Sequence, residues 1–278
     1  MIDTHLHLWQ LWRGWYGWNT PALGALHADS LIGDVRDEMT SAGVTGAIVV
    51  QAADATAETD WLLALAREEP QILGVVGYLP LEDPAEVERL LLAYAGSPLV
   101  GVRQLWHDHA RQDELRNPDL IAGLALLADA GLPVDIPDAF PALWPALTHA
   151  VDRADRARFV LDHCGKPPFG DSRAWREWEL RFIELAGRPN VIVKLSGLFG
   201  GSGSPNAATD EELARVVELT RSVAGADRTM IGSDWPMSRD RLGYAATLEK
   251  LTALISTWSA AEQSAATSQN ARATYGLS

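Results

Sequence analysis

The chain has 278 residues and a net charge of −14, from 23 Lys and Arg against 37 Asp and Glu. Hydrophobic residues make up 47% of it and charged residues 22%, a globular composition that excludes a disordered or fibrous protein. So acidic a chain, with no run rich in Lys or Arg, is repelled by phosphate backbones, and we expect no nucleic-acid partner.

Three further absences in the sequence indicate the compartment. No apolar run approaches the roughly 18–20 residues that a membrane span needs. The first residues, MIDTHLHLW, lack the basic and apolar regions of a secretion signal. The single cysteine, Cys164, cannot form an internal disulfide. We therefore expect a cytoplasmic protein that has no membrane partner.

Short apolar runs rich in β-branched residues recur at roughly even spacing and predict eight strands. In chain order they span 2–8, 47–52, 72–79, 100–105, 133–136, 158–163, 191–196 and 230–234. Segments with helical spacing of apolar residues follow them at 30–42, 56–69, 84–95, 117–130, 141–154, 172–187, 209–224 and 240–257, with a last helix at 259–270. Cap signals fit these bounds, for example Pro118 in a first turn and Gly131 after a helix end.

Apolar strands that alternate with helices indicate a parallel sheet covered on both faces. Eight such units match a (β/α)8 TIM barrel in number and in length. We therefore predict an α/β protein with one barrel domain over residues 1–278 and an additional C-terminal helix. A doubly wound open sheet is the alternative, but no glycine-rich phosphate turn follows the first strand. The glycine-rich run 200–208 is expected to be a flexible loop.

Polar residues collect at the ends of the predicted strands, where barrels of this kind carry their catalytic groups. The first strand ends in His5 and His7, which alternation places on the same side, so that both imidazoles can face one metal ion or one substrate. A lone His-x-His in a strand is usually a packing feature. Together with His163 at the end of the sixth strand and Asp234 at the end of the eighth, it predicts a catalytic site.

Other polar residues near strand ends are candidates for binding substrate. They are Gln51 after the second strand, Arg103 in the fourth with His107 in the following loop, and Lys194 in the seventh. An unpaired ammonium in a buried strand is costly, so Lys194 needs a partner or a function. Lys166 either has a function at the end of its strand or merely caps a helix or pairs with Asp162.

Four tryptophans, Trp9, Trp12, Trp15 and Trp18, follow the two histidines at intervals of three residues. The segment is either a structural cover over the barrel mouth or a surface that contacts substrate, since indole faces stack on sugar-like rings. We expect Trp9 to be structural and at least one of the others to contact substrate, with Trp12 and Trp15 as the named candidates.

Five strings carry a resemblance to a known family: DTHLHLW (3–9), GVR (101–103), LDHCGKPP (161–168), KLSGL (194–198) and GSDWP (232–236). In this order they resemble the amidohydrolase superfamily, in particular its amidohydrolase-2 branch of lactonases. That branch includes sugar-acid lactonases and 2-pyrone-4,6-dicarboxylate lactonase. The resemblance extends to NARATYGL at 270–277. It implies a barrel hydrolase whose active-site positions are occupied by His5, His7, His163 and Asp234.

The resemblance also bears on the cofactor. Binuclear amidohydrolases carry a bridging Lys or Glu after the fourth strand and a His after the fifth, whereas Arg103 and Asp135 stand at these places here. A two-metal site is therefore not expected. Either no cofactor is required, or a single divalent ion, Zn²⁺ first, is bound by His5, His7, Asp234 and His163.

These features predict a hydrolase of carbohydrate metabolism that opens the ring ester of a small polar lactone, a sugar-acid lactone first. Asp234 is expected to take a proton from the attacking water, while His5, His7 and His163 polarise the carbonyl. Arg103 and Lys194 are expected to hold a carboxylate or hydroxyl of the substrate. A metal-dependent decarboxylase of the same superfamily and a catalytically silent binding barrel are the alternatives. A homo-oligomer is left open.

Overall fold

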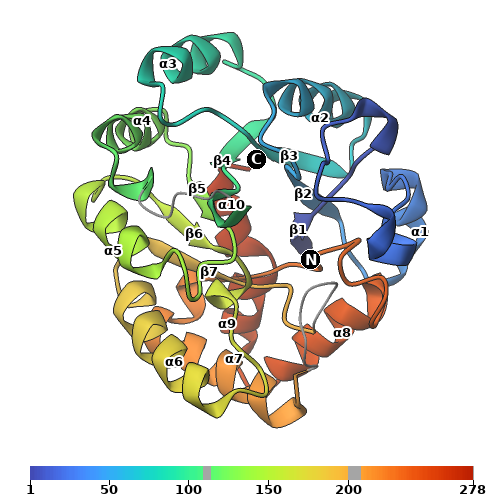
Figure 1. Ribbon diagram of the computed structural model, residues 1–278. Helices are drawn as coiled ribbons and strands as arrows, with labels where there is room; N and C mark the ends of the chain where they lie inside the picture. Colours follow the sequence, from blue (N-terminus) through green and yellow to red (C-terminus); the bar gives the residue numbers. More distant parts are fainter. Residues whose placement is uncertain (109–113, 200–207, 278) are drawn as a thin grey trace.

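The computed structural model describes residues 1–108, 114–199 and 208–277. Its centre is a sheet of eight parallel strands that pair in chain order: β1 Ile2–Leu6, β2 Gly46–Val50, β3 Ile72–Gly77, β4 Leu99–Arg103, β5 Val134–Ile136, β6 Phe159–Leu161, β7 Val191–Leu195 and β8 Thr229–Ile231. The sheet curves into a nearly closed barrel (Figure 1). The chain just beyond β8 joins β1, because the His7 N–H donates to the Trp235 carbonyl at 2.7 Å and the Asp234 N–H donates to the His5 carbonyl at 2.8 Å.

Helices surround this barrel (Figure 1). They are α1 Arg36–Ser41, α2 Thr56–Glu68, α3 Pro84–Ala93, α4 Pro118–Asp129, α5 Trp144–Arg153, α6 Ser172–Ala186, α7 Asp210–Ala224 and α8 Tyr244–Leu254, followed by α9 Ala260–Ser264 and α10 Asn270–Tyr275. Several begin at side-chain caps that the sequence contains. The Asn117 carboxamide oxygen accepts from the Asp119 N–H before α4, and Thr209 and Glu212 form a capping box before α7. The predicted α/β TIM barrel with an additional C-terminal helix is confirmed.

Four predicted helices differ from the observed ones by several residues. The segment predicted at 141–154 is helical over Trp144–Arg153, and that at 240–257 over Tyr244–Leu254. The segment predicted at 30–42 becomes helical only at Arg36, because a 3₁₀ turn occupies Ile32–Asp34 and Val35 is not helical at ψ −8° and φ −122°. The last helix, predicted to end at 270, continues through a π-helical turn at Ala265–Gln269 into α10. Seven predicted strands also run one to three residues too far, because the prediction included residues that follow the last residue paired in the sheet.

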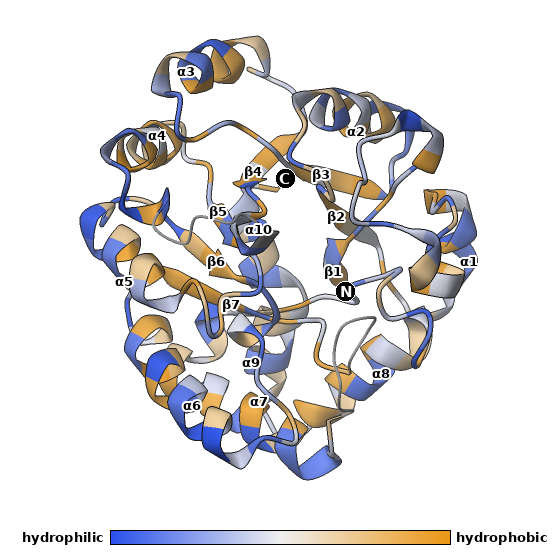
Figure 2. Cartoon of the chain, viewed as in Figure 1, coloured by the Kyte–Doolittle hydropathy of each residue, from blue (hydrophilic) through white to orange (hydrophobic). Residues whose placement is uncertain are grey.

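Two clusters of buried hydrophobic residues form the core of the barrel. The larger lies between the strands and the surrounding helices, and the strands and inward helix faces are correspondingly apolar in Figure 2. The smaller fills the barrel and includes Ile2, Ile192 and Met230 near the beginnings of their strands, packed with Tyr275 of α10. The C-terminal helix therefore closes the end of the barrel where the strands begin, and the other end remains for the cavity.

No helix in the described ranges 1–108, 114–199 and 208–277 is long and apolar enough to cross a membrane. The glycine-rich run predicted to be a flexible loop lies, but for Ala208, outside these ranges.

Candidate active site

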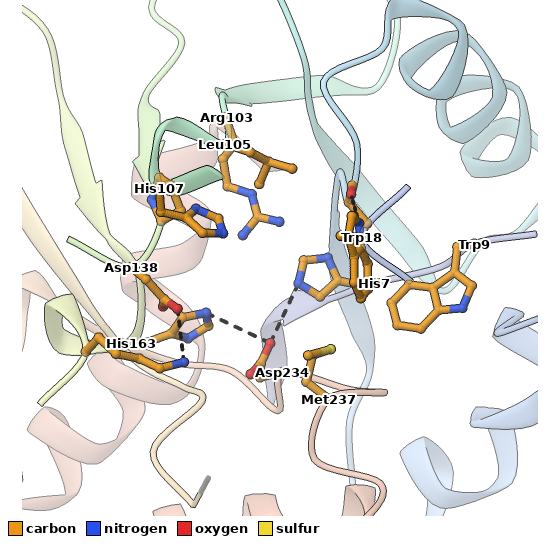
Figure 3. A pocket seen from close by; sticks show the side chains of 13 residues that line it. His7, Trp9, Trp18, Arg103, Leu105, His107, Asp138, His163, Asp234 and Met237 are labelled. Atoms are coloured by element: carbon orange, nitrogen blue, oxygen red, sulfur yellow. Dashed lines mark hydrogen bonds and ion pairs between the residues drawn. The ribbon is translucent and has the colours of Figure 1, made fainter. Parts of the chain in front are cut away.

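A cavity lies at the end of the barrel where the strands finish (Figure 3). Its walls come from the segments that follow β1, β2, β4, β5, β6 and β8. The residues that line it are His7, Trp9, Trp18, Ala52, Arg103, Leu105, His107, Pro137, Asp138, His163, Lys166, Asp234 and Met237. Residues far apart in the sequence thus share one space, because parallel strands bring their carboxyl ends to the same edge.

An unusual backbone conformation presents His163 and Asp234 to this cavity. Residues 163–166 all have positive φ, at 55°, 53°, 68° and 67°, and Asp234 has a φ of 56°. For a residue with a side chain this conformation costs roughly 1–2 kcal/mol. Such strain persists where the surrounding structure holds it, and it often marks a functional site.

Gly197 follows β7 and allows these two residues to approach. A Cβ atom at this position would lie 2.5 Å from Nδ1 of His163 and 2.9 Å from Oδ2 of Asp234, and the φ of Gly197 is 58°. Both the contact and the φ exclude a side chain. The glycine of the KLSGL string is therefore required by the packing of the two predicted catalytic residues.

His5, His7 and Asp234 converge on one point. The Nε2 atoms of the two histidines are 3.1 Å apart, and Oδ1 of Asp234 lies 3.8 Å from that of His5 and 3.6 Å from that of His7. Burial lowers the pKa of both imidazoles, which favours their neutral forms. Burial opposes ionisation of Asp234, but His163, His7 and His5 outweigh it and hold the pKa of this carboxyl well below its usual value.

The partners of the other ring nitrogens fix the tautomers. Nδ1 of His7 lies 2.8 Å from the Val50 carbonyl, which only accepts, so Nδ1 carries the proton and Nε2 a lone pair. The Lys194 ammonium lies 3.4 Å from Nδ1 of His5, but the Asp162 carboxylate lies closer to this nitrogen at 3.3 Å. A donor, NH1 of Arg103, lies 3.4 Å from Nε2, so the same tautomer is favoured. Two lone pairs and a carboxylate oxygen therefore face one another. This donor set fits a divalent cation, and the three residues form a group whose ligand atoms lie within 4.8 Å of one another.

His163 completes the site from the turn that follows β6. Its Nδ1 lies 2.9 Å from the Ser196 hydroxyl and its Nε2 4.0 Å from Oδ1 of Asp234. Its ring centroid is 4.7 Å from that of His5. The structure thus brings together the four residues that the sequence predicts to be catalytic.

A buried network of charges supports His5 from inside the barrel. Lys194 contacts Asp135 through its ammonium and lies 3.2 Å from Asp162 and 3.4 Å from Nδ1 of His5. The Tyr275 hydroxyl, reaching up from α10, donates to Asp135 at 3.1 Å. Burial raises the pKa of Asp135 to about 6, although Lys194 opposes this. His5, Asp135 and Asp162 form a second group with ligand spacing, but the Lys194 ammonium already contacts all three.

The guanidinium of Arg103 contacts other groups of the protein, which leaves it only partly available to a ligand. NH1 lies 3.3 Å from Oδ2 of Asp162 and 3.4 Å from Nε2 of His5, and NH2 donates to the Gln51 carbonyl. The side chain of Gln51 in turn donates to the Arg103 carbonyl and to Asp54, and Gln51 does not line the cavity. The sequence had suggested that Gln51 and Lys194 bind substrate. Neither Gln51 nor the buried Lys194 is placed to contact a substrate in this cavity.

The tryptophans are arranged differently from the prediction. Only Leu11–Arg13 forms a 3₁₀ turn, so the four indoles do not share one side. Trp12 is 72% exposed and outside the cavity, and Trp15 packs against Tyr16 and Trp61. Trp12 and Trp15 are thus not brought to the cavity. Trp9 and Trp18 line it instead, together with His107, which was a candidate.

Two charged lining residues were not among the predicted site residues: Asp138, which the sequence reasoning missed, and Lys166, whose role it left open. Lys166 does not pair with Asp162 but forms an ion pair with Asp138 at 3.0 Å. Asp138 lies two residues beyond β5. Its position just past a strand end was the signal that could have identified it.

Comparisons with known proteins find a matching family and similar lactonases. The sequence model of the amidohydrolase family matches residues 2–277. An L-fucono-1,5-lactonase of Burkholderia ambifaria is 34% identical over 86% of this chain and 81% of its own length. An L-fucono-1,5-lactonase of Burkholderia multivorans is 31% identical over 99% of this chain and 96% of its own. The crystal structure of an amidohydrolase from B. multivorans with bound zinc superimposes with a TM-score of 0.91, at 29% identity over 100% of this chain and 99% of that one.

Proposed function

The chain belongs to the amidohydrolase family, as its motifs predicted, and on that premise we propose that it hydrolyses the ring ester of a sugar-acid lactone. The observation that carries the proposal is the carboxylate of Asp234, which lines the cavity together with His7 and lies beside the buried His5. A carboxylate next to two neutral imidazoles can orient a water molecule and take its proton. The two lactonase relatives supply the substrate class.

In the proposed reaction, water lies among Oδ1 of Asp234 and the two Nε2 atoms and attacks the lactone carbonyl. Asp234 accepts a proton from the water as the new C–O bond forms. The tetrahedral centre then expels the ring oxygen, which takes the proton back from Asp234, and the product is a hydroxy acid. His7 serves in this scheme as an acceptor that orients water, because its only N–H is donated to the Val50 carbonyl. This differs from the sequence expectation that all three histidines polarise the carbonyl.

Two other groups are suited to the negative charge that develops on the carbonyl oxygen. His163 donates from Nε2 when the Ser196 hydroxyl donates to its Nδ1. Arg103 contributes a fixed positive charge 3.4 Å from His5. Preorganised donors and charges of this kind stabilise the transition state in a site that excludes water. Arg103 thus acts on the reacting centre in this proposal, rather than as a clamp for a substrate carboxylate.

The same residues fit a single metal ion. His5, His7 and Asp234 would hold it, since their lone pairs and carboxylate converge without a donor hydrogen between the two Nε2 atoms. A divalent ion bound there supplies a Lewis acid and lowers the pKa of bound water. Lys194 disfavours a second ion, because its ammonium lies at the other group of ligands.

The test is a panel of lactones on enzyme treated with chelator, read as acid release with a pH indicator, before and after Zn²⁺ is added back. We expect L-fucono-1,5-lactone to be hydrolysed. Asp234→Asn keeps the shape of the side chain and removes the base, so kcat should fall by about 10²–10⁴ with the fold intact by circular dichroism. A variant within tenfold of wild type would remove Asp234 from the role of base. Release of CO2 from an aromatic acid, with no lactone hydrolysed, would favour the decarboxylase alternative.

A further inference from the structure

An ion pair in the cavity wall takes no part in the proposed chemistry. Oδ2 of Asp138 and Nζ of Lys166 lie 3.0 Å apart, with side chains 31% and 40% exposed, and both line the cavity. Asp138 follows β5, and Lys166 ends the left-handed turn that begins at His163. Three non-glycine residues of this turn have a positive φ, a backbone conformation that is energetically unfavourable for them. The turn presents both His163 and Lys166 to the cavity.

Both members of the pair are charged. Burial opposes ionisation of Asp138, but Lys166, His163 and His107 outweigh it and lower its pKa. Burial likewise opposes the charge of Lys166, but Asp138 and Asp234 raise its pKa. The wall therefore offers an anionic acceptor and a cationic donor side by side at neutral pH.

The opposite side of the cavity is less polar. Figure 3 shows Trp18 and Met237 across the cavity from Asp138. The Trp18 indole is held in place because its Nε1–H donates to the Ala52 carbonyl at 2.7 Å. A ring with an apolar face and hydroxyl groups along its edge matches these two walls, since indole faces pack on the C–H faces of such rings.

We propose that Asp138 and Lys166 are a subsite for two neighbouring hydroxyl groups of the lactone ring, and that they determine the preference for polyhydroxylated lactones. One hydroxyl donates to the carboxylate and the other accepts from the ammonium. This inference rests on the proposed function and adds to it the part of the site that selects the substrate.

A carboxylate on the substrate fits this place poorly. It would lie beside Asp138, whose charge already neutralises Lys166 at 3.0 Å. The other cation of the lining, Arg103, is engaged by Asp162 and by the Gln51 carbonyl. Among the Arg, Lys, Asp and Glu side chains of the lining, the two cations Arg103 and Lys166 are matched by the two anions Asp138 and Asp234. The lining thus suits a neutral polyol better than a dicarboxylate.

The experiment compares three lactones on wild type and on Asp138→Asn: L-fucono-1,5-lactone, δ-valerolactone, which has the same ring size without hydroxyls, and 2-pyrone-4,6-dicarboxylate. We expect the variant to lose about 10- to 100-fold in kcat/KM on the first, the effect of one hydrogen bond to a charged group. Its activity on δ-valerolactone should stay within threefold of wild type, by this proposal. Activity on the dicarboxylate should rise relative to the first lactone, because the ammonium of Lys166 loses its partner.

Lys166→Met and the double variant complete a double-mutant cycle, in which the two losses should be less than additive because both residues bind one diol. The matched control is the pair Asp210 and Lys250, 2.7 Å apart and outside the cavity lining, altered in the same way. These controls should leave all three activities unchanged. An equal loss on the first two lactones would overturn the proposal, since the pair would then position the catalytic groups.

Binding of L-fucopyranose, which has ring hydroxyls but no ester, is measured in parallel by calorimetry. If wild type hydrolyses no lactone, the proposed function fails, and the subsite is judged on this sugar alone. Binding that Asp138→Asn weakens at least tenfold supports the subsite, in line with the loss expected for a hydrogen bond to a charged group. Binding that is absent, or is the same in both proteins, overturns it.

Discussion

Replacing Lys194 with methionine tests the buried charge network beneath the candidate active site. The Lys194 side chain is fully buried, and its ammonium contacts Asp135 and lies 3.2 Å from Asp162. Methionine keeps a long apolar stem but leaves two buried carboxylates without this cation. Asp162 retains Arg103 at 3.3 Å, whereas Asp135 retains the hydrogen bond from the neutral Tyr275 hydroxyl.

Removing one partner of a buried ion pair costs about 3–5 kcal/mol of unfolding free energy. At roughly 2–4 °C per kcal/mol for a chain of this size, the melting temperature should fall by about 6–20 °C. The loss should be greater at pH 8 than at pH 5.5. The pKa of Asp135 in the folded protein is raised to about 6. The stability that the protonated carboxyl contributes is therefore lost as the pH rises through that value, and above it the ionised carboxylate needs the cation that the variant lacks.

The double variant Asp135→Asn with Lys194→Met removes the uncompensated charge and should recover most of the lost stability, since Tyr275 can donate to the carboxamide oxygen. Lys250→Met is the control, because Lys250 pairs with an exposed Asp210 and should contribute only about 0–1 kcal/mol. Thermal and urea unfolding followed by circular dichroism measure all four proteins. If Lys194→Met unfolds within about 1 kcal/mol of wild type, or the double variant is no more stable than the single one, the network does not act as described.

Three further predictions concern the cavity, a buried carboxyl and the metal. Trp18→Ala should raise KM for the hydrolysed lactone, because Trp18 lines the cavity. Trp12→Ala, at a position 72% exposed, should change neither KM nor the melting temperature. Steady-state kinetics and thermal melts measure both variants, and equal effects would contradict the placement of Trp18 in the substrate cavity. Burial raises the pKa of Glu58 from 4.5 to about 8, so this residue's contribution to stability should decline as the pH rises over that interval, and melts of Glu58→Gln between pH 5 and 8 should show a flatter profile than wild type. Calorimetric titration with Zn²⁺ after chelation should give one equivalent and not two, and His7→Ala should abolish that binding; two equivalents in wild type would refute the placement of Lys194.

Local patterns in the sequence were sufficient for the barrel. Eight apolar runs and the helices between them correspond to β1–β8 and α1–α8, because strand and helix periodicities are short-range properties of the chain. The strand ends were harder to place. The predicted strands continued to Ser196 and Asp234, whereas β7 ends at Leu195 and β8 at Ile231, because contacts with other strands decide where pairing stops.

The sequence by itself also determined which residues meet at the candidate site. His5 and His7 share a side through strand alternation, and His163 and Asp234 join them because parallel strands end at one edge. The tertiary structure alone decided which group each of them faces. Four features depend on distances between segments that are remote in sequence. The ammonium of Lys194 occupies a second cluster of ligands, and Arg103 is held by Asp162. Trp18 rather than Trp12 reaches the cavity, and Asp138 pairs with Lys166. Side-chain pairing is set by such distances, to a few tenths of an ångström, and no periodicity or spacing along the chain encodes them.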